Sequence, residues 1–300
     1  MDNEGNLRAL TTRTDLKKNR AFPMASRDSN GKLLVGAAVK AGSRDEIDMN
    51  RITALYHAGC NIIVLDAQNG DCDLQVHYIK EIKSKFPSLD VVAGNVVRVS
   101  QAKLLLDAGA DALRIGMGVG SVATTQLVKA VGRAQLSAIY NCARIARKYS
   151  VPVIADGGAK NTGCLIKALA IGASAVMMGS LLAGVDESPG EYFYQNGVRL
   201  KHYRANNIFD SRKRDSTGEA IVRVSSGVSG AVVDKGPLAR YIPYLCQSIR
   251  HGLQDMGVIS LVKMHVELYS GKLRFELRSP SAQKEGGVHD LHSFQQRLYA

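Results

Sequence analysis

The strongest constraint on the fold is a repeat in which a helical segment ends at glycine and a short apolar run follows. It occurs three times, at residues 58–67, 108–117 and 171–180. Glycine just after a helix readily adopts the left-handed conformation that ends the helix. The apolar runs lack polar alternation, which is typical of strands buried on both faces of a parallel sheet. The repeat therefore predicts helices alternating with parallel strands.

Further apolar runs complete the predicted sheet. The six predicted strands cover residues 33–39, 62–67, 91–96, 112–117, 151–156 and 175–181. Ser43 to Glu46 form a capping box that predicts a helix through Leu55, and Ser100 is the predicted cap of a helix over residues 101–108. The pattern predicts an α/β fold built from βα units.

The pattern changes after residue 200. Residues 201–223 are polar, basic and aperiodic, so we expect a mobile excursion there. Helical periodicity returns over residues 238–256 and 261–269, and residues 279–292 are expected to be irregular. These changes divide the chain into a linker (1–30), barrel units (31–200), a flap-like excursion (201–236) and C-terminal helices with a tail (237–300).

Charge and cysteine content restrict the class of protein. The formal net charge of +12 favours anionic ligands such as nucleotides, but no zinc-site, RRM or helix-turn-helix signature points to nucleic acid. The five cysteines have no CxxC spacing, so we expect free thiols in a reducing compartment. This compartment would be the cytoplasm, with the nucleus as a further location. No run reaches the roughly 18 apolar residues of a membrane span, and the acidic start is unlike a signal peptide.

Polar and glycine residues gather where the predicted strands end. They are Asp66, Asn95, residues 116–118, residues 156–158, Gly179 and Ser180. In (β/α) barrels the active site lies at the carboxyl ends of the strands. The last two strands end in Gly-Gly and Gly-Ser, where backbone amides can approach an anion closely. We therefore expect a phosphate there, with ordinary tight turns as the alternative.

A second cluster is the loop at residues 116–126, Gly-Met-Gly-Val-Gly-Ser-Val-Ala-Thr-Thr-Gln. Glycines at Gly116, Gly118 and Gly120 let the backbone turn tightly and direct carbonyl groups inward. Such carbonyls can coordinate a monovalent cation. A turn is the default interpretation of an isolated GxGxG pattern, and the position of this loop after a strand favours a site.

This loop carries a resemblance to a known family. Residues 113–121 resemble the active-site signature of IMP dehydrogenase, in the IMP dehydrogenase/GMP reductase superfamily. Further matches occur at residues 12–18, 65–66, 94–97, 155–158, 177–181, 189–193, 227–231, 234–236, 285–289 and 297–298. The resemblance implies a (β/α)8 TIM-type barrel and the NAD-dependent oxidation of IMP to XMP in guanine nucleotide biosynthesis.

The resemblance also implies roles for single residues. In the family a loop cysteine attacks C2 of the purine, hydride passes to NAD, and a flap with an activated water then completes hydrolysis. The implied nucleotide contacts are Ser121, Asp156, Gly158, Gly179, Ser180 and Tyr203. The implied cofactor contacts are Asp66, Asn95, Gly116 and Gly118, and Thr125 would orient the water. The implied potassium ligands are Gly118, Gly120 and Ala123, with Glu285, Gly286 and Gly287 of a neighbouring subunit.

The sequence departs from the family pattern at four places. Ala123 stands at the position of the attacking cysteine, and a methyl group cannot form a covalent adduct. The flap has no clear arginine–tyrosine pair, Ser226 replaces a glutamine, and residues 205–208 replace Gly-Met-Gly-Ser. The candidates for the flap arginine are Arg212, Arg214 and Arg223. Finally, six strands are predicted where the family has eight, which would leave two exposed edges.

Three hypotheses follow. An active IMP dehydrogenase would make NADH from IMP. A non-catalytic paralogue, in homo-oligomers or in hetero-oligomers with a full-length family member, would bind a purine nucleotide without turnover. A degenerate, truncated product would be insoluble or molten. The missing barrel units have three matching explanations: truncation, supply by a partner, or a compromised fold.

Overall fold

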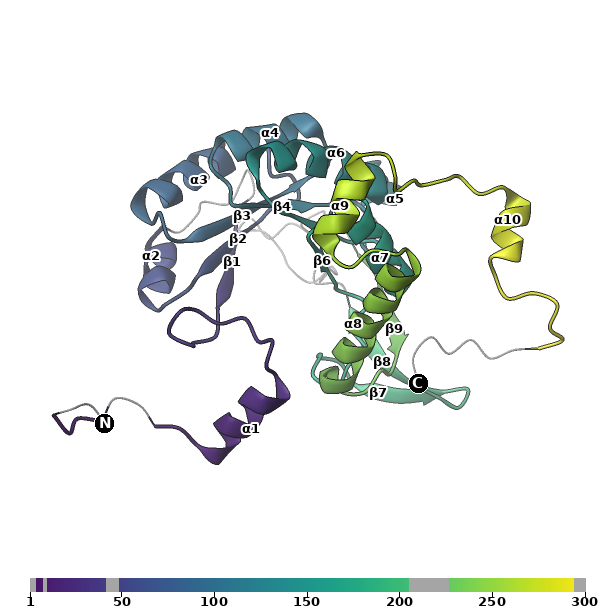
Figure 1. Cartoon of the computed structure of the whole chain (residues 1–300), viewed down its shortest axis with the longest axis horizontal. Coiled ribbons are helices and arrows are strands. Elements are labelled where there is room, and N and C mark those ends of the chain that lie inside the picture. Colours follow the sequence, from purple (N-terminus) through teal and green to yellow (C-terminus); the bar gives the residue numbers. More distant parts are fainter. Residues whose placement is uncertain (1–3, 8–9, 42–48, 205–226, 294–300) are drawn as a thin grey trace, which may run out of the picture.

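The computed structural model describes residues 4–7, 10–41, 49–204 and 227–293. The body of the chain is a parallel sheet of six strands in the spatial order β1-β2-β3-β4-β5-β6. The strands are β1 (Gly36–Lys40), β2 (Ile62–Asp66), β3 (Asp90–Val96), β4 (Ala112–Ile115), β5 (Val153–Asp156) and β6 (Ala175–Met177). Each strand pairs with the next one in the chain, and the sheet curls into half of a barrel (Figure 1). The predicted α/β fold, an incomplete TIM-type barrel of six βα units, is confirmed.

Helices connect successive strands. They are α2 (Met49–His57), α3 (Asp73–Lys85), α4 (Val99–Asp107), α5 (Thr125–Lys129), α6 (Gln135–Ala146) with the 3-10 turn η1 (Arg147–Tyr149), and α7 (Thr162–Ala170). Figure 1 shows α2, α3, α4 and α6 along the outer side of the curled sheet. Within the described sheet, β1 and β6 each have a strand partner on one side only. The two expected open edges are therefore present.

The hydrophobic core lies between the sheet and these helices. Ile63 and Leu65 of β2 and Leu113 and Ile115 of β4 are all 0% exposed. Strand β3 is buried at every position except its first residue, as expected for a strand covered on both faces. Complete burial of a side chain of this size stabilises the fold by about 1.5–3 kcal/mol.

Helix α4 begins earlier than predicted, so the assignment of Ser100 as its cap was wrong. The helix starts at Val99, with Arg98 as the N-cap residue. The side-chain Oε1 of Gln101 accepts hydrogen bonds from the backbone N–H groups of Val97 and Arg98, both at 3.0 Å. These bonds satisfy two donors that the helix start would otherwise leave unpaired. The predicted capping box at residues 43–46 lies outside the described residues.

A second, antiparallel sheet follows the barrel units. It has the order β7-β8-β9 and consists of β7 (Tyr192–Gln195), β8 (Val198–Arg204) and β9 (Ser229–Val233). The expectation of an unpacked excursion was wrong for residues 201–204, which belong to β8. Lys201 is only 1% exposed. Its buried ammonium group is compensated by hydrogen bonds, because Nζ donates to the carbonyl oxygens of Val185, at 2.7 Å, and Asp186, at 3.3 Å. The rest of the expected excursion, with Arg212, Arg214, Arg223 and Ser226, lies outside the described residues.

The chain ends in helices and an arm. The predicted helices are confirmed as α8 (Leu238–Asp255) and α9 (Leu261–Tyr269), which pack against α7. The tail was expected to be irregular, but it contains α10 (Pro280–Glu285), which Ser279 caps by accepting from the N–H of Ala282 at 3.2 Å. Helix α10 stands away from the body of the chain, as does α1 (Arg13–Ala21), which buries no residue (Figure 1).

Two further features concern the thiols of the chain and the apolar character of its helices. All five cysteines are free thiols, as predicted. Within the described ranges, no helix combines the length and the apolar character that crossing a membrane requires.

The core placement predicts unequal effects for two leucines. Leu113 is fully buried in β4, whereas Leu127 in α5 is 89% exposed. We expect Leu113→Ala to lower the free energy of unfolding by about 2–5 kcal/mol because it leaves a cavity. Leu127→Ala is the control and should change it by less than about 0.5 kcal/mol. Urea unfolding followed by circular dichroism measures both, and equal losses would contradict this core.

Candidate functional site

A cleft of about 740 Å³ lies at the carboxyl ends of the strands. This volume is in the usual range for sites that hold small molecules. The cleft brings together seven of the residues predicted to contact ligands: Asp66, Asn95, Gly116, Gly118, Gly120, Thr125 and Asp156. The cleft thus joins the ends of β2 to β5, whereas Gly158, Gly179 and Ser180 of the predicted rim do not line it, and the roles of the individual residues remain predictions.

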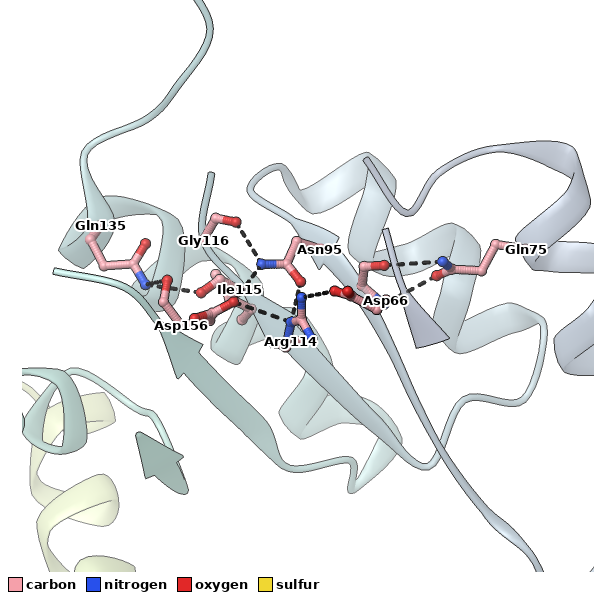
Figure 2. Close-up of polar contacts among 9 residues, drawn as sticks. Asp66, Gln75, Asn95, Arg114, Ile115, Gly116, Gln135 and Asp156 are labelled. Atoms are coloured by element: carbon pink, nitrogen blue, oxygen red, sulfur yellow. Dashed lines mark hydrogen bonds and ion pairs between the residues drawn. The ribbon is translucent and has the colours of Figure 1, made fainter. Parts of the chain in front are cut away.

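One polar network joins the ends of four neighbouring strands (Figure 2). Arg114 of β4 donates through Nη2 to Oδ1 of Asp66 and through Nε to Oδ1 of Asn95. Its Nε also lies 3.2 Å from Oδ2 of Asp156. Asn95 completes the network, because its Nδ2 donates to Oδ2 of Asp156 at 2.9 Å and to the carbonyl oxygen of Gly116 at 2.8 Å.

The network leaves two carboxylate oxygens without a protein donor. The Arg114 side chain is 13% exposed, whereas those of Asp66 and Asp156 are 53% and 27% exposed. Within the described chain, no hydrogen-bond donor reaches Oδ2 of Asp66 or Oδ1 of Asp156. A carboxylate oxygen is a strong acceptor, so both oxygens can bind hydroxyl groups of a ligand in the cleft.

Arg114 is a site residue that sequence reasoning did not single out. It lies in the short strand Ala-Leu-Arg-Ile, where every other side chain is apolar. A charged group in an otherwise buried strand needs a partner of opposite charge, since burying it unpaired is costly. That interruption of the apolar run was the available signal.

Two glutamines support the network and were also missed. Gln135 of α6 donates through Nε2 to the carbonyl oxygens of Ile115, at 2.9 Å, and Asp156, at 3.0 Å, which ties β4 to β5 (Figure 2). Gln75 of α3 is 0% exposed and makes a reciprocal pair of hydrogen bonds with the backbone of Gly94. No sequence pattern identifies either glutamine, because both lie in helices and their partners are backbone groups of strands elsewhere in the chain.

A second group of predicted residues meets beside the cleft. The hydroxyl of Ser121 donates to the hydroxyl of Ser180. A Cβ built on Gly179 would lie 3.8 Å from the hydroxyl oxygen of Tyr203. These four residues come from the loop after β4, the end of β6 and β8, and they are candidates for one phosphate-binding corner. The sixth predicted nucleotide contact, Gly158, lies against the Gln135 side chain instead.

The loop that carries Ala123 is held by backbone contacts. The N–H of Ala123 donates to the carbonyl oxygen of Gly120 at 3.1 Å, and Ala123 forms an antiparallel bridge with Gly227. Val228 extends the bridge by donating to the carbonyl oxygen of Val122 at 3.0 Å. Residue 123 is thus held at a defined place, and its side chain is a methyl group.

The predicted potassium ligands do not come together within one chain. The carbonyl oxygen of Gly118 accepts from Nε2 of Gln126 at 2.7 Å, and that of Gly120 accepts from Ala123. Glu285 ends α10, which Figure 1 shows away from α5 and its loop. Residues 283–293 are all exposed. Because residues 285–287 were predicted to come from a neighbouring subunit, the potassium site remains a prediction.

The close packing at the strand ends predicts that Gly116 cannot be replaced. Its φ is +148°, and an added Cβ would lie 1.9 Å from the carbonyl oxygen of Asp156. We expect Gly116→Ala to lower the free energy of unfolding by about 2 kcal/mol or more through overpacking and backbone strain. Gly163→Ala in α7 is the control, because its Cβ comes no closer than 3.4 Å to another atom. Thermal unfolding would contradict the geometry if both variants behaved alike.

Comparison with known proteins agrees with the resemblance. A family model described as "IMP dehydrogenase / GMP reductase domain" matches residues 5–289. Inosine-5'-monophosphate dehydrogenase of Toxoplasma gondii is 46% identical over 97% of this chain and 63% of its own length. The proteins of the same name from Caenorhabditis elegans and Schizosaccharomyces pombe are 46% and 45% identical over all of this chain and 57% and 59% of theirs.

This chain spans about three fifths of the length of these curated relatives. The match nevertheless includes both sheets and the loop between β4 and α5. The chain belongs to the IMP dehydrogenase / GMP reductase family.

Proposed function

We propose that this chain binds a purine nucleotide, IMP or XMP, next to a site for NAD, as a non-catalytic member of guanine nucleotide biosynthesis. The observation that carries the proposal is the complete strand-end network beside a loop whose residue 123 is alanine. The polar groups that could bind a nucleotide are present, whereas the cysteine thiol that starts the family reaction is replaced by the methyl group of Ala123.

The nucleotide would lie between the network and the phosphate corner. The open oxygen of Asp156 can accept from the ribose hydroxyls. Gly179 and Ser180 offer backbone amides to the phosphate, and the Ser180 hydroxyl, which accepts from Ser121, keeps its own hydrogen as a further donor. Tyr203 lies beside Gly179 and would close the corner.

NAD would take the other half of the cleft. Asp66 suits a ribose of the dinucleotide, because its carboxylate is half-exposed in the cleft and its Oδ2 has no donor among the described residues. The backbone at Gly116 and Gly118 has no side chain to obstruct a flat ring. When bound, NAD supplies the hydride acceptor of the family reaction.

The chemical step lacks a nucleophile. The methyl group of Ala123 has no lone pair to donate to C2 of the purine, so the addition that must precede hydride loss cannot begin there. No cysteine of the chain lines the cleft. Burial raises the pKa of Cys142 to about 11, so this thiol stays protonated at neutral pH. The Thr125 hydroxyl lines the cleft, but no base within the described residues contacts it.

The proposal includes association with other chains. Helix α10, which ends at Glu285, stands away from the body of its own chain (Figure 1). We propose that it meets a second copy or a full-length family member. A cytoplasmic location accords with the five free thiols.

The decisive test combines IMP binding with repair of the nucleophile. We expect calorimetry to show that the parent chain binds IMP, and we expect no NADH on adding IMP and NAD. Ala123→Cys should make NADH, because the loop already holds residue 123 in place. Val131→Cys is the matched control, since it adds a thiol to the cleft wall at a different position and should make none.

Two results would contradict the proposal. NADH formation by the parent chain would favour the second candidate function, the complete family reaction, which the intact network also supports. Absence of IMP binding by a chain with a cooperative melting transition would show that the cleft does not hold this nucleotide.

The nucleotide contact of Asp156 gives a separate prediction. Asp156→Asn keeps the shape of the side chain but removes its charge, so we expect IMP to bind about 10- to 100-fold more weakly. Asp107→Asn is the control, because Asp107 is half-exposed at the end of α4 and pairs with Lys103. Calorimetry on both variants tests this, and equal affinities would rule out Asp156 as a ligand of the ribose.

A further inference from the structure

Arg114 is the one charged side chain that contacts both carboxylates of the cleft. It pairs with Asp66 of β2 and with Asp156 of β5, from the strand that lies between β3 and β5. Under the proposed function, Asp66 faces the cofactor and Asp156 faces the nucleotide. The same guanidinium group therefore touches both halves of the binding site.

Asp66 has two cationic side chains near it, and it forms its ion pair with Arg114. Lys40 of β1 lies directly opposite Asp66 in the strand register and also lines the cleft. Within the described residues, the ion pair of Asp66 is nevertheless made with Arg114, two strands away, and none is made with Lys40. A planar guanidinium can donate to several acceptors at fixed angles, which an ammonium group cannot do.

Stability alone does not account for this arrangement. Buried ion networks are often no more stabilising than apolar residues of similar volume. Here three polar side chains, those of Asn95, Arg114 and Asp156, stand at the ends of strands whose inner positions are apolar. Each carboxylate keeps one oxygen for a ligand, and its other oxygen pairs with Arg114.

We propose that Arg114 is a positioning residue that couples the two halves of the cleft, so that a bound nucleotide strengthens the binding of NAD. The inference rests on the proposed function. A ligand hydroxyl on Asp156 immobilises that carboxylate, and through Arg114 it restricts Asp66 to the rotamer that the second ligand needs. The second ligand then loses less conformational entropy on binding. Linkage requires NAD to strengthen nucleotide binding by the same factor.

The replaced nucleophile makes this coupling measurable at equilibrium. Because no turnover is expected, the complex with both ligands can accumulate in the parent chain. The Kd of IMP is measured by calorimetry without NAD and with saturating NAD. We expect NAD to lower it about fivefold or more, in the usual range for coupled sites.

Substitution of Arg114 should remove the coupling. Arg114→Lys keeps the charge but cannot reach both carboxylates, so we expect the two Kd values for IMP to become equal. Arg147→Lys in η1 is the matched control and should keep the coupling, because η1 precedes β5 and lies at the opposite end of the strands. A residue with a merely structural role would weaken both ligands without changing the ratio of the two Kd values.

A second variant serves if Arg114→Lys does not fold. Asp66→Asn breaks the cofactor end of the bridge at a more exposed side chain. The Kd of IMP is measured for this variant without NAD and with NAD at a concentration that saturates the variant, and we expect the two values to be equal.

The outcomes separate the two proposals. If the parent chain binds IMP and NAD but each with the same Kd whether or not the other is present, the coupling is overturned and the proposed function stands. Weaker IMP binding in the presence of NAD, or coupling that survives in both variants, would also overturn it. If IMP or NAD does not bind at all, the proposed function fails and the coupling fails with it.

Discussion

The parallel ladder is the constraint on which the rest of this structure depends. Each of the six strands pairs with its neighbour in the same direction, from Gly36 opposite Ile62 to Asp156 opposite Met177. Parallel strands bring all their carboxyl ends to one edge of the sheet, so residues far apart in the chain become neighbours there. The apolar interior of β2, β3 and β4 fixes the register, because a shift by one residue would turn Leu65 or Leu113 out of the core.

Polar residues at that edge must satisfy one another before they can bind a ligand. Arg114 would be costly to bury alone, and Asp66, Asn95 and Asp156 compensate it. Gln135 and Gln75 hold the backbone beneath the network. The result is a site in which each carboxylate presents one open oxygen to the cleft.

Under the proposed function, binding and chemistry are separated in this chain. The groups that would hold a nucleotide and a dinucleotide lie at the strand ends. The position that carries the attacking cysteine in the family is residue 123, which lies in the loop after β4. The bridge of Ala123 to Gly227 shows that the loop conformation does not need a thiol at residue 123. A single substitution can therefore remove the reaction and leave the binding site intact, which is the basis of the proposed function.

The sequence by itself determined the six βα units and the polar strand ends, because apolar runs and glycine after helices are local patterns. It also indicated Asp66, Asn95 and Asp156 as cleft residues from their positions alone. Only the tertiary structure decided that Arg114 bridges two carboxylates and that the buried Lys201 donates to a backbone carbonyl oxygen. The same holds for the position of α10 away from the body of the chain. These features depend on contacts between distant segments, and such contacts leave no periodic trace in the sequence.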